Sequence, residues 1–169
     1  MPGSEATASA REAMIPDPAG WEDPVTGLEG PVFWQTLLAS EISRSTRYER
    51  PLTVVLLDID GVRELQAAWG DEVAREIIRE IAQCIRRLAR GSDHCTRISL
   101  GRFGILLTET NEITAINFVE RVRTSVPSLL PRACDQVRFT FGWATPHPGE
   151  APQAVVSRAV ARMAADRAD

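Results

Sequence analysis

Apolar positions in the first half of the chain predict helices on either side of a buried strand. From Pro31 to Tyr48, apolar residues recur at the three- and four-residue spacing of a helix that buries one face. The run Leu52 to Leu57 is apolar at nearly every position, which is typical of a central strand covered on both sides. A short helix is then predicted from Val62 to Trp69 and a longer one from Val73 to Leu88, running on toward Arg90.

The second half predicts a hairpin, a helix, a strand and a final helix. Cys95 to Ile98 and Phe103 to Leu107 are rich in strand formers, and the four residues between them contain the glycine that a reversal needs. The remaining elements are a helix at Glu112–Val126, a strand at Val137–Trp143 and a helix at Ala151–Arg167. After an N-terminal helix, the order βααββαβα predicts an α/β domain with a mostly antiparallel central sheet flanked by helices.

The length of 169 residues suits one domain. Residues 1–22 contain few large apolar side chains, so we expect a flexible N-terminal tail followed by a domain at residues 23–169. A short helix at Ala8–Met14 and docking of Trp21 on the domain are open alternatives.

The composition argues against two classes of binding partner. The net charge is −4, all 19 basic residues are arginine, and no run reaches the length of a membrane span, so neither nucleic acid nor a bilayer is an expected partner. Cys84, Cys95 and Cys134 lack metal-binding spacing, as do His94 and His147, so we expect buried thiols in a reducing cytoplasm.

Three stretches together carry a family resemblance. Asp23 to Leu28 reads Asp-Pro-Val-Thr-Gly-Leu, Asp58-Ile59-Asp60 closes the buried strand, and a hairpin follows with Ser99-Leu100-Gly101-Arg102-Phe103 across its turn. This order resembles the GGDEF family of diguanylate cyclases, which have a nucleotide cyclase, palm-like fold. The family writes Gly-Gly-Asp/Glu-Glu-Phe across the turn, so the signature here is degenerate.

The resemblance implies that the catalytic chemistry is lost. The family's metal ligands map to Asp58, to the carbonyl of Ile59 and to Arg102, and a guanidinium cannot bind a cation. The neighbouring acidic position is Gly101, and the glycine that lets the backbone approach phosphate is Leu100. We therefore expect only remnant catalytic positions at Asp58, Gly101 and Arg102, with no Mg²⁺ or other cofactor and no cyclase activity.

Guanine recognition in the former active site is also expected to fail. The family's guanine-contacting Asn and Asp fall on Gln66 and Arg75, and Arg75 has only donors where a carboxylate accepts. Arg63 and Arg167 replace the family's lysines, which are milder changes taken alone.

The family's separate inhibitory site keeps its register. Arg90 and Asp93 form an Arg-x-x-Asp five residues before the signature, and Arg121 stands eighteen positions after the signature phenylalanine, where the family has a further arginine. Arginine can stack on guanine or bind its edge, and a carboxylate can accept from that edge. These three residues therefore predict a cyclic di-GMP site and a receptor role in bacterial second-messenger signalling.

Other interpretations stay open. The same tetrapeptide pattern recurs at Arg132 to Asp135, where the family has no site, and Arg90 with Asp93 also fits a solvated helix end with a capped turn. The chain could instead be a ligand-independent protein-interaction module or, less readily, a residual cyclase. An unknown protein partner and a homodimer are both compatible with the sequence.

The contacts of Arg102 and the role of Asp60 each allow more than one interpretation. Arg102 either forms an ion pair with Asp58 or points into solvent, and Asp60 is expected to act as a helix N-cap rather than as a ligand.

Overall fold

The architecture of the chain is an antiparallel sheet between two layers of helices. A computed structural model describes residues 14–131, 134 and 137–168. Its helices are α2 Pro31–Tyr48, α3 Val62–Trp69, α4 Asp71–Leu88, α5 Glu112–Ser125 and α6 Pro152–Ala168, with a 3₁₀ turn at Val126–Leu129. Its strands are β1 Leu52–Asp60, β2 His94–Arg97, β3 Arg102–Thr108 and β4 Arg138–Ala144.

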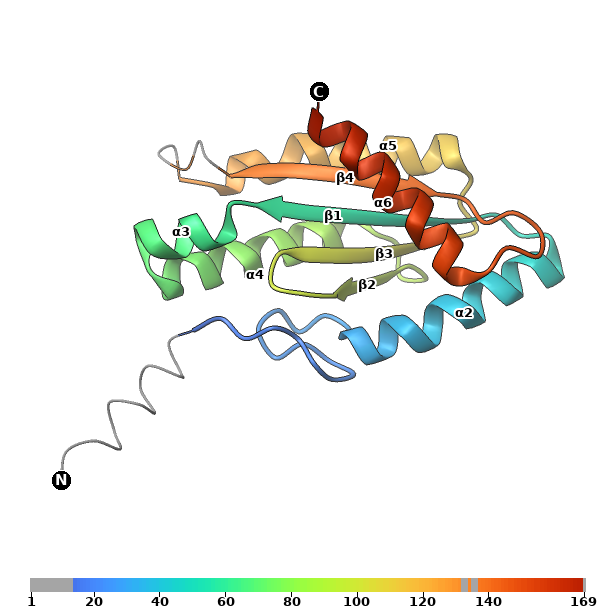
Figure 1. Ribbon diagram of the computed structural model, residues 1–169, viewed down its shortest axis with the longest axis horizontal. Coiled ribbons are helices and arrows are strands. Elements are labelled where there is room, and N and C mark those ends of the chain that lie inside the picture. The colour runs from blue at the N-terminus through green and yellow to red at the C-terminus, as the bar shows by residue number, and fades with distance from the viewer. Residues whose placement is uncertain (1–13, 132–133, 135–136, 169) are drawn as a thin grey trace.

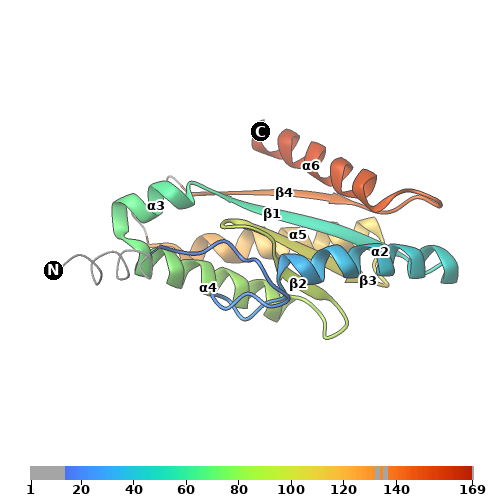
Figure 2. The same cartoon turned by 60° about the horizontal axis from the view of Figure 1, so that its bottom comes forward.

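The strands lie in the order β2-β3-β1-β4, and all three pairings are antiparallel. The apolar side chains on one face pack against α4 and α5, and those on the other face pack against α2 and α6. Figures 1 and 2 show these two layers, with the long β1 in the interior of the sheet. The predicted fold class and element order are confirmed, including the central place of the first strand.

The differences from the predicted boundaries are local. β1 continues past the apolar run through Asp60, because Asp58, Ile59 and Asp60 remain paired with β4, so the carboxylates close the strand as predicted. The chain beyond α5 keeps a single 3₁₀ turn around Pro127 before it leaves the helical path.

The three cysteines are free and buried, as predicted. Burial raises the pKa of the Cys95 thiol to about 11, which keeps it protonated and unreactive near neutral pH. Within the described ranges, no helix combines the length and the apolar character that crossing a bilayer requires.

Part of the predicted tail packs on the domain, so the boundary at residue 23 is too late. Ile15 is buried in the larger core cluster, and the backbone of Leu100 donates to Asp17 Oδ1 over 2.7 Å. Trp21 is 59% exposed and meets Phe33 edge-on, with ring centres 6.3 Å apart. The alternative of a helix at Ala8–Met14 falls almost wholly on residues that lie outside the described ones.

A buried ion pair joins this N-terminal segment to the hairpin. Arg97 Nη1 lies 3.0 Å from Asp23 Oδ1, and both side chains are completely buried. Arg97 also donates to the carbonyls of Pro16 and Leu100. The Asp23 carboxylate accepts from the turn that follows it, so every charged group here has hydrogen-bond partners. The pair therefore fixes the entry of the domain against the hairpin.

Candidate functional site

Asp58 and Arg102 face each other across β1 and β3. They are direct partners in the antiparallel register, which brings their side chains together on one face of the sheet. Arg102 Nε donates to Asp58 Oδ1 over 2.6 Å, and Arg102 Nη2 donates to Oδ2 over 2.7 Å. This forked geometry is the strong form of an arginine–carboxylate contact. The ion-pair alternative is confirmed, and Arg102 does not point away into solvent.

A second arginine completes the cluster from the end of α6. Arg167 Nε lies 3.0 Å from Asp60 Oδ2, and its Nη2 lies 2.9 Å from Oδ1 and 3.4 Å from Asp58 Oδ2. Thr140 on β4 also donates to Asp60, over 2.6 Å. Two carboxylates and two guanidinium groups thus form a closed network without net charge.

The expectation that Asp60 caps a helix is wrong. The N-cap of α3 is Gly61, which has no side chain to accept a hydrogen bond. Because Asp60 is still paired within the sheet, its side chain turns toward Thr140 and Arg167 instead. Burial raises the pKa of Asp60, but the hydrogen bonds from Arg167 and Thr140 outweigh it and hold the pKa below its ordinary value.

The donor set at these carboxylates does not fit a divalent cation. Mg²⁺ needs several oxygen ligands, whereas both oxygens of Asp58 already accept from guanidinium groups. Among the residues that the structure describes, no group of three or more acidic, histidine or cysteine side chains could hold a metal ion. That the protein works without a metal stays a prediction.

The hairpin turn lies close against β1 at Gly101. The Gly101 carbonyl accepts from Ile59 N over 2.8 Å. A β-carbon on residue 101 would lie 2.9 Å from the Ile59 carbonyl oxygen and 3.1 Å from a methyl of Val62. Such a contact is too short for the present backbone, so the turn leaves no room for the side chain that the family carries here.

The two positions expected to miss guanine lie in the α3–α4 region. Gln66 Nε2 donates to Asp71 Oδ1 over 3.1 Å, which ties α3 to the first residue of α4. Arg75 lies on α4 and is partly buried. The amide that replaces the family's asparagine is therefore engaged within the protein.

Asp93 is buried at the opposite end of the hairpin from the turn. It is 4% exposed, its Oδ2 accepts from Arg90 N over 2.7 Å, and its Oδ1 accepts from Thr108 N over 3.0 Å. Asp93 is therefore not solvated, as the helix-end alternative required, because its carboxylate fastens the loop after α4 to the end of β3. The capped-turn interpretation correctly predicts the contact with Arg90 N.

Arg90, Asp93 and Arg121 nevertheless line one shallow pocket. Its lining also includes Thr110 and Thr114, with Phe118 and aliphatic carbons of Leu88 and Leu107. Arg90 and Arg121 are exposed, and Arg121 donates to the carbonyl of Leu88 over 3.4 Å while its guanidinium lies 5.8 Å from the ring centre of Phe118. The cavity holds only about 20 Å³. The structure thus brings together the three residues that the sequence selected.

The second tetrapeptide of this pattern gives no comparable observation. Arg132 and Asp135 both lie outside the residues that the structure describes.

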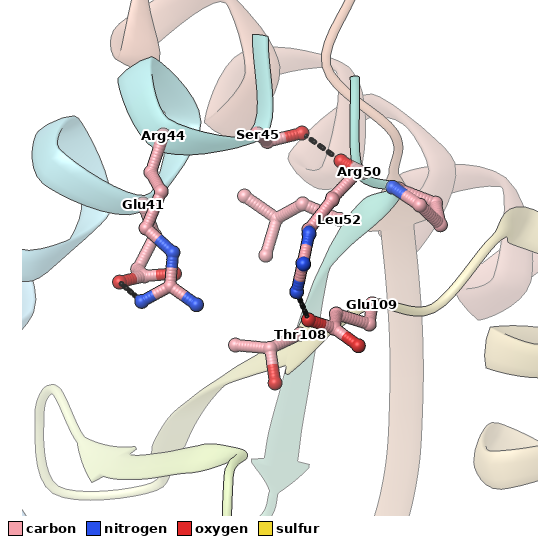
Figure 3. Close-up of a pocket in the computed structure, with 8 residues that line it drawn as sticks. Glu41, Arg44, Ser45, Arg50, Leu52, Thr108 and Glu109 are labelled. Carbon is pink, nitrogen blue, oxygen red and sulfur yellow. Dashed lines mark hydrogen bonds and ion pairs between the residues drawn. The ribbon is translucent and has the colours of Figure 1, made fainter. Parts of the chain in front are cut away.

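A further hollow lies near the Thr108 end of β3 and is closed by polar contacts. Figure 3 shows its lining by Glu41, Arg44, Ser45, Arg50, Leu52, Thr108 and Glu109. Arg50 forms an ion pair with Glu109, and Ser45 Oγ donates to the carbonyl of Arg50 over 2.6 Å. Its volume of about 10 Å³ leaves space for little more than a water molecule.

Sequence reasoning missed the structural role of Arg97. Its partner Asp23 is 74 residues away, and only the presence of a charged residue in a strand of otherwise buried side chains hinted at a paired charge. It also missed Thr140, which shares Asp60 with Arg167.

Comparison with known proteins agrees with the fold and the motif order. The model of the diguanylate cyclase GGDEF domain family matches residues 21–168. The diguanylate cyclase DosC of Escherichia coli K12 is 33% identical over 104 residues, which are 62% of this chain and 23% of that protein. The chain therefore spans about a quarter of the length of this curated relative.

Solved structures give the same result. The GGDEF domain of DgcB from Caulobacter crescentus, crystallised with c-di-GMP, superposes with a TM-score of 0.81 at 22% identity and covers 89% of this chain and 91% of that one. The diguanylate cyclase SiaD of Pseudomonas aeruginosa, in complex with its activator SiaC, superposes with a TM-score of 0.79 at 28% identity. That match covers 97% of this chain and 62% of SiaD. At 22% identity, the likeness to DgcB shows the fold alone.

The ionic network makes a prediction about pH. In Arg167→Gln, the Asp60 carboxylate loses its forked contact, so we expect its pKa to rise, as measured by carboxyl carbon chemical shifts in an NMR titration. Because the native pKa is lowered, the stabilisation is present above the unfolded value of about 3.9 and is lost as the pH falls through the folded value. The variant should therefore be less stable than the wild type at neutral pH, by less than ~1 kcal/mol for so exposed a pair.

The stability difference should shrink as the pH falls through the lowered pKa of Asp60, because below that value this carboxyl is protonated in both proteins. Arg47→Gln, at an exposed position in the last turn of α2, is the matched control and should leave the Asp60 titration unchanged. An unaltered pKa in Arg167→Gln would contradict the network.

Proposed function

Because the chain belongs to the GGDEF family, we propose that it is a catalytically inactive member that acts as a cyclic di-GMP receptor in bacterial second-messenger signalling. The observation that carries the proposal is the contrast between the two ends of one hairpin. At the turn, Arg102 donates a hydrogen bond to each oxygen of the Asp58 carboxylate. At the other end, Arg90, Asp93 and Arg121 line one pocket.

The argument for inactivity rests on charge and space at the turn. Two-metal chemistry on a nucleotide requires carboxylates that can neutralise cations. Here Arg102 brings a positive charge to the metal position, and the backbone of Ile59 fills the place of an acidic side chain at Gly101. Both features oppose the binding of a metal-bound triphosphate.

Loss of guanine recognition supports the same conclusion. The Gln66 amide donates to Asp71, and Arg75 offers donors where the family's carboxylate accepts from the base. Restoring the turn alone would therefore leave the base without its usual partners.

The receptor role rests on the chemistry of the pocket that remains. Arg90 and Arg121 are exposed on either side of it, so one guanidinium can stack on guanine while the other binds its edge or a phosphate. The Asp93 carboxylate accepts two backbone hydrogen bonds and a longer one from Thr108 Oγ1, and a carboxylate has about four acceptor positions, so one is left for a guanine N–H. The exposed hydroxyl-bearing Thr114 adds a polar edge.

Asp93 also favours a second candidate function, a protein-interaction module that binds no nucleotide. Its bonds to Arg90 N and Thr108 N give the carboxylate a structural role without any ligand. SiaD, which is similar in structure, is in complex with an activator protein. Under this alternative an unidentified protein or a second copy of the chain is the partner, and cyclic di-GMP does not bind.

The first functional prediction is that the protein has no diguanylate cyclase activity. Purified protein supplied with GTP and Mg²⁺ or Mn²⁺ should form no cyclic di-GMP in a chromatographic assay, because Arg102 and Gly101 replace the acidic positions. The triple variant Leu100→Gly, Gly101→Asp and Arg102→Glu should also stay inactive, since Gln66 and Arg75 are unchanged and the new side chain at 101 meets the Ile59 backbone.

Product that disappears in Asp58→Ala would show a residual cyclase and overturn the inactive assignment. A fully active triple variant would show that base recognition had survived.

The second functional prediction concerns binding. Cyclic di-GMP should bind in calorimetry, and Arg90→Ala and Arg121→Ala should each lose a stacking or forked contact worth ~1–3 kcal/mol, which weakens affinity roughly tenfold to a hundredfold. Both residues are exposed, so circular dichroism should show native unfolding curves for both variants. Asp93→Ala is unsuitable as the main test, because it removes two backbone hydrogen bonds and should destabilise the fold.

Arg63→Ala is the control, since Arg63 is an exposed arginine on α3, close in sequence to the remnant site and outside the pocket lining. It should bind as the wild type does. No binding by the wild type at ~100 μM ligand, or an equal loss in the Arg63 and Arg90 variants, would favour the protein-interaction module.

A further inference from the structure

The polar side chains of α6 follow the outer edge of β4. Arg158 Nη2 donates to the Thr145 carbonyl over 2.6 Å, and Arg162 Nη1 approaches the Trp143 carbonyl at 3.5 Å. One turn further on, Asp166 Oδ2 accepts from the backbone N–H of residue 141 over 2.8 Å. Four helical residues rise about 6 Å and two strand residues span about 6.6 Å, so the two periods match. One α6 side chain per turn therefore reaches the outer edge of β4, while the helix itself crosses the sheet obliquely (Figure 1).

The cover ends before the edge does, at Phe139. Phe141 pairs with Leu57 and directs its N–H outward to Asp166, and hydrogen-bond direction alternates along an antiparallel pair. Phe139, two residues earlier and opposite Ile59, therefore also directs its N–H and carbonyl outward. Ile59 N bonds to Gly101 on the other side, which agrees with this alternation. Within the described ranges, no hydrogen bond of the Phe139 backbone to another group is found on this edge.

The opposite edge of the sheet is better covered. The backbone of Glu29 pairs with β2, accepting from Arg97 N over 2.9 Å and donating to the Cys95 carbonyl over 3.2 Å. An open strand edge can pair with a strand of another chain, so the short uncovered part of β4 is a candidate docking site.

A basic hollow of about 370 Å³ adjoins this uncovered part. Its lining includes Arg123, Arg138, Arg167, Asp166, Phe139 and Pro127. Arg123 is engaged by Asp166, and Arg167 by Asp60. Arg138 is exposed and has no ion pair with any residue in the described part of the chain. Because Arg123 and Arg167 are each paired with a carboxylate, Arg138 leaves this hollow with one uncompensated positive charge, on a chain whose net charge is −4.

We propose that the Phe139 edge of β4 and Arg138 bind an extended acidic segment of a partner protein by strand addition. The open backbone groups supply main-chain hydrogen bonds, and the hollow supplies charge complementarity and an apolar wall at Phe139 and Pro127. A second copy of the chain fits less well, because pairing two such edges about a two-fold axis would bring their Arg138 residues together. This surface does not depend on cyclic di-GMP binding.

The probe for the test is a short peptide of alternating glutamate and valine with blocked ends. In an NMR titration of the whole chain it should shift the amides of Arg138 to Thr140 and protect the Phe139 amide from solvent exchange. Arg138→Gln should weaken binding about twofold to fivefold, the size of an exposed charge pair, and added salt should weaken it further. Arg47→Gln, at the far end of α2, is the matched control and should bind as the wild type does.

Two altered peptides separate the contributions. Lysine in place of glutamate should abolish binding, and N-methylation of the backbone amides that face β4 should abolish it while keeping the charge. The proposal is overturned if the wild type shows no shift at β4, if the N-methylated peptide binds equally well, or if inorganic sulfate alone reproduces the shifts and the protection. None of these outcomes affects the calorimetry with cyclic di-GMP, so the two proposals fail separately.

Discussion

The structure depends on the buried ion pair between Arg97 and Asp23. Two charges without solvent exposure are costly unless their remaining hydrogen-bonding groups are satisfied, and here the carbonyls of Pro16 and Leu100 accept from the guanidinium. The pair holds the entry segment, the end of β2 and the hairpin turn in one arrangement. With the turn held there, β3 leaves it in the register that sets Arg102 opposite Asp58.

The position of Arg102 determines how the charges of Asp58 and Asp60 are neutralised. In a cyclase, carboxylates at the end of this strand bind metal ions. Here the guanidinium groups of Arg102 and Arg167 neutralise Asp58 and Asp60 directly. The exchange preserves charge balance and packing while removing the oxygen ligands on which nucleotide chemistry depends. The pocket at Arg90 lies at the other end of the hairpin, so the proposed loss of catalysis would leave it unchanged.

Elements with strong periodicity could be predicted from the sequence. The bounds of α2 and α3 agree with the apolar spacing, and the uniformly apolar run in β1 correctly placed that strand in the interior. Arg90, Asp93 and Arg121, which were selected by their spacing to the turn, line one pocket, and their binding of a ligand stays a prediction. The predictions of the elements succeeded because register along a hairpin and a helix is set by local geometry.

Long-range partners could not be predicted in the same way. Asp60 follows a strand pattern and precedes a helix, so an N-cap was the natural local expectation, yet Thr140 and Arg167 lie 80 and 107 residues later. The burial of Asp93 depends on Thr108 from another strand, which no local pattern encodes. Ile113 fits a helical apolar face and is 74% exposed, because α5 turns that position away from the sheet.

The proposed function requires that arginine side chains take the place of a metal ion at Asp58 and Asp60. The most direct measurement is the line broadening of backbone amides on addition of Mn²⁺, a paramagnetic ion that binds oxygen ligands as Mg²⁺ does. The amides of Asp58 to Gly61 should keep their intensity, while exposed carboxylates elsewhere cause only weak, general broadening. Selective loss of those amide signals in the wild type would show a metal site and contradict it.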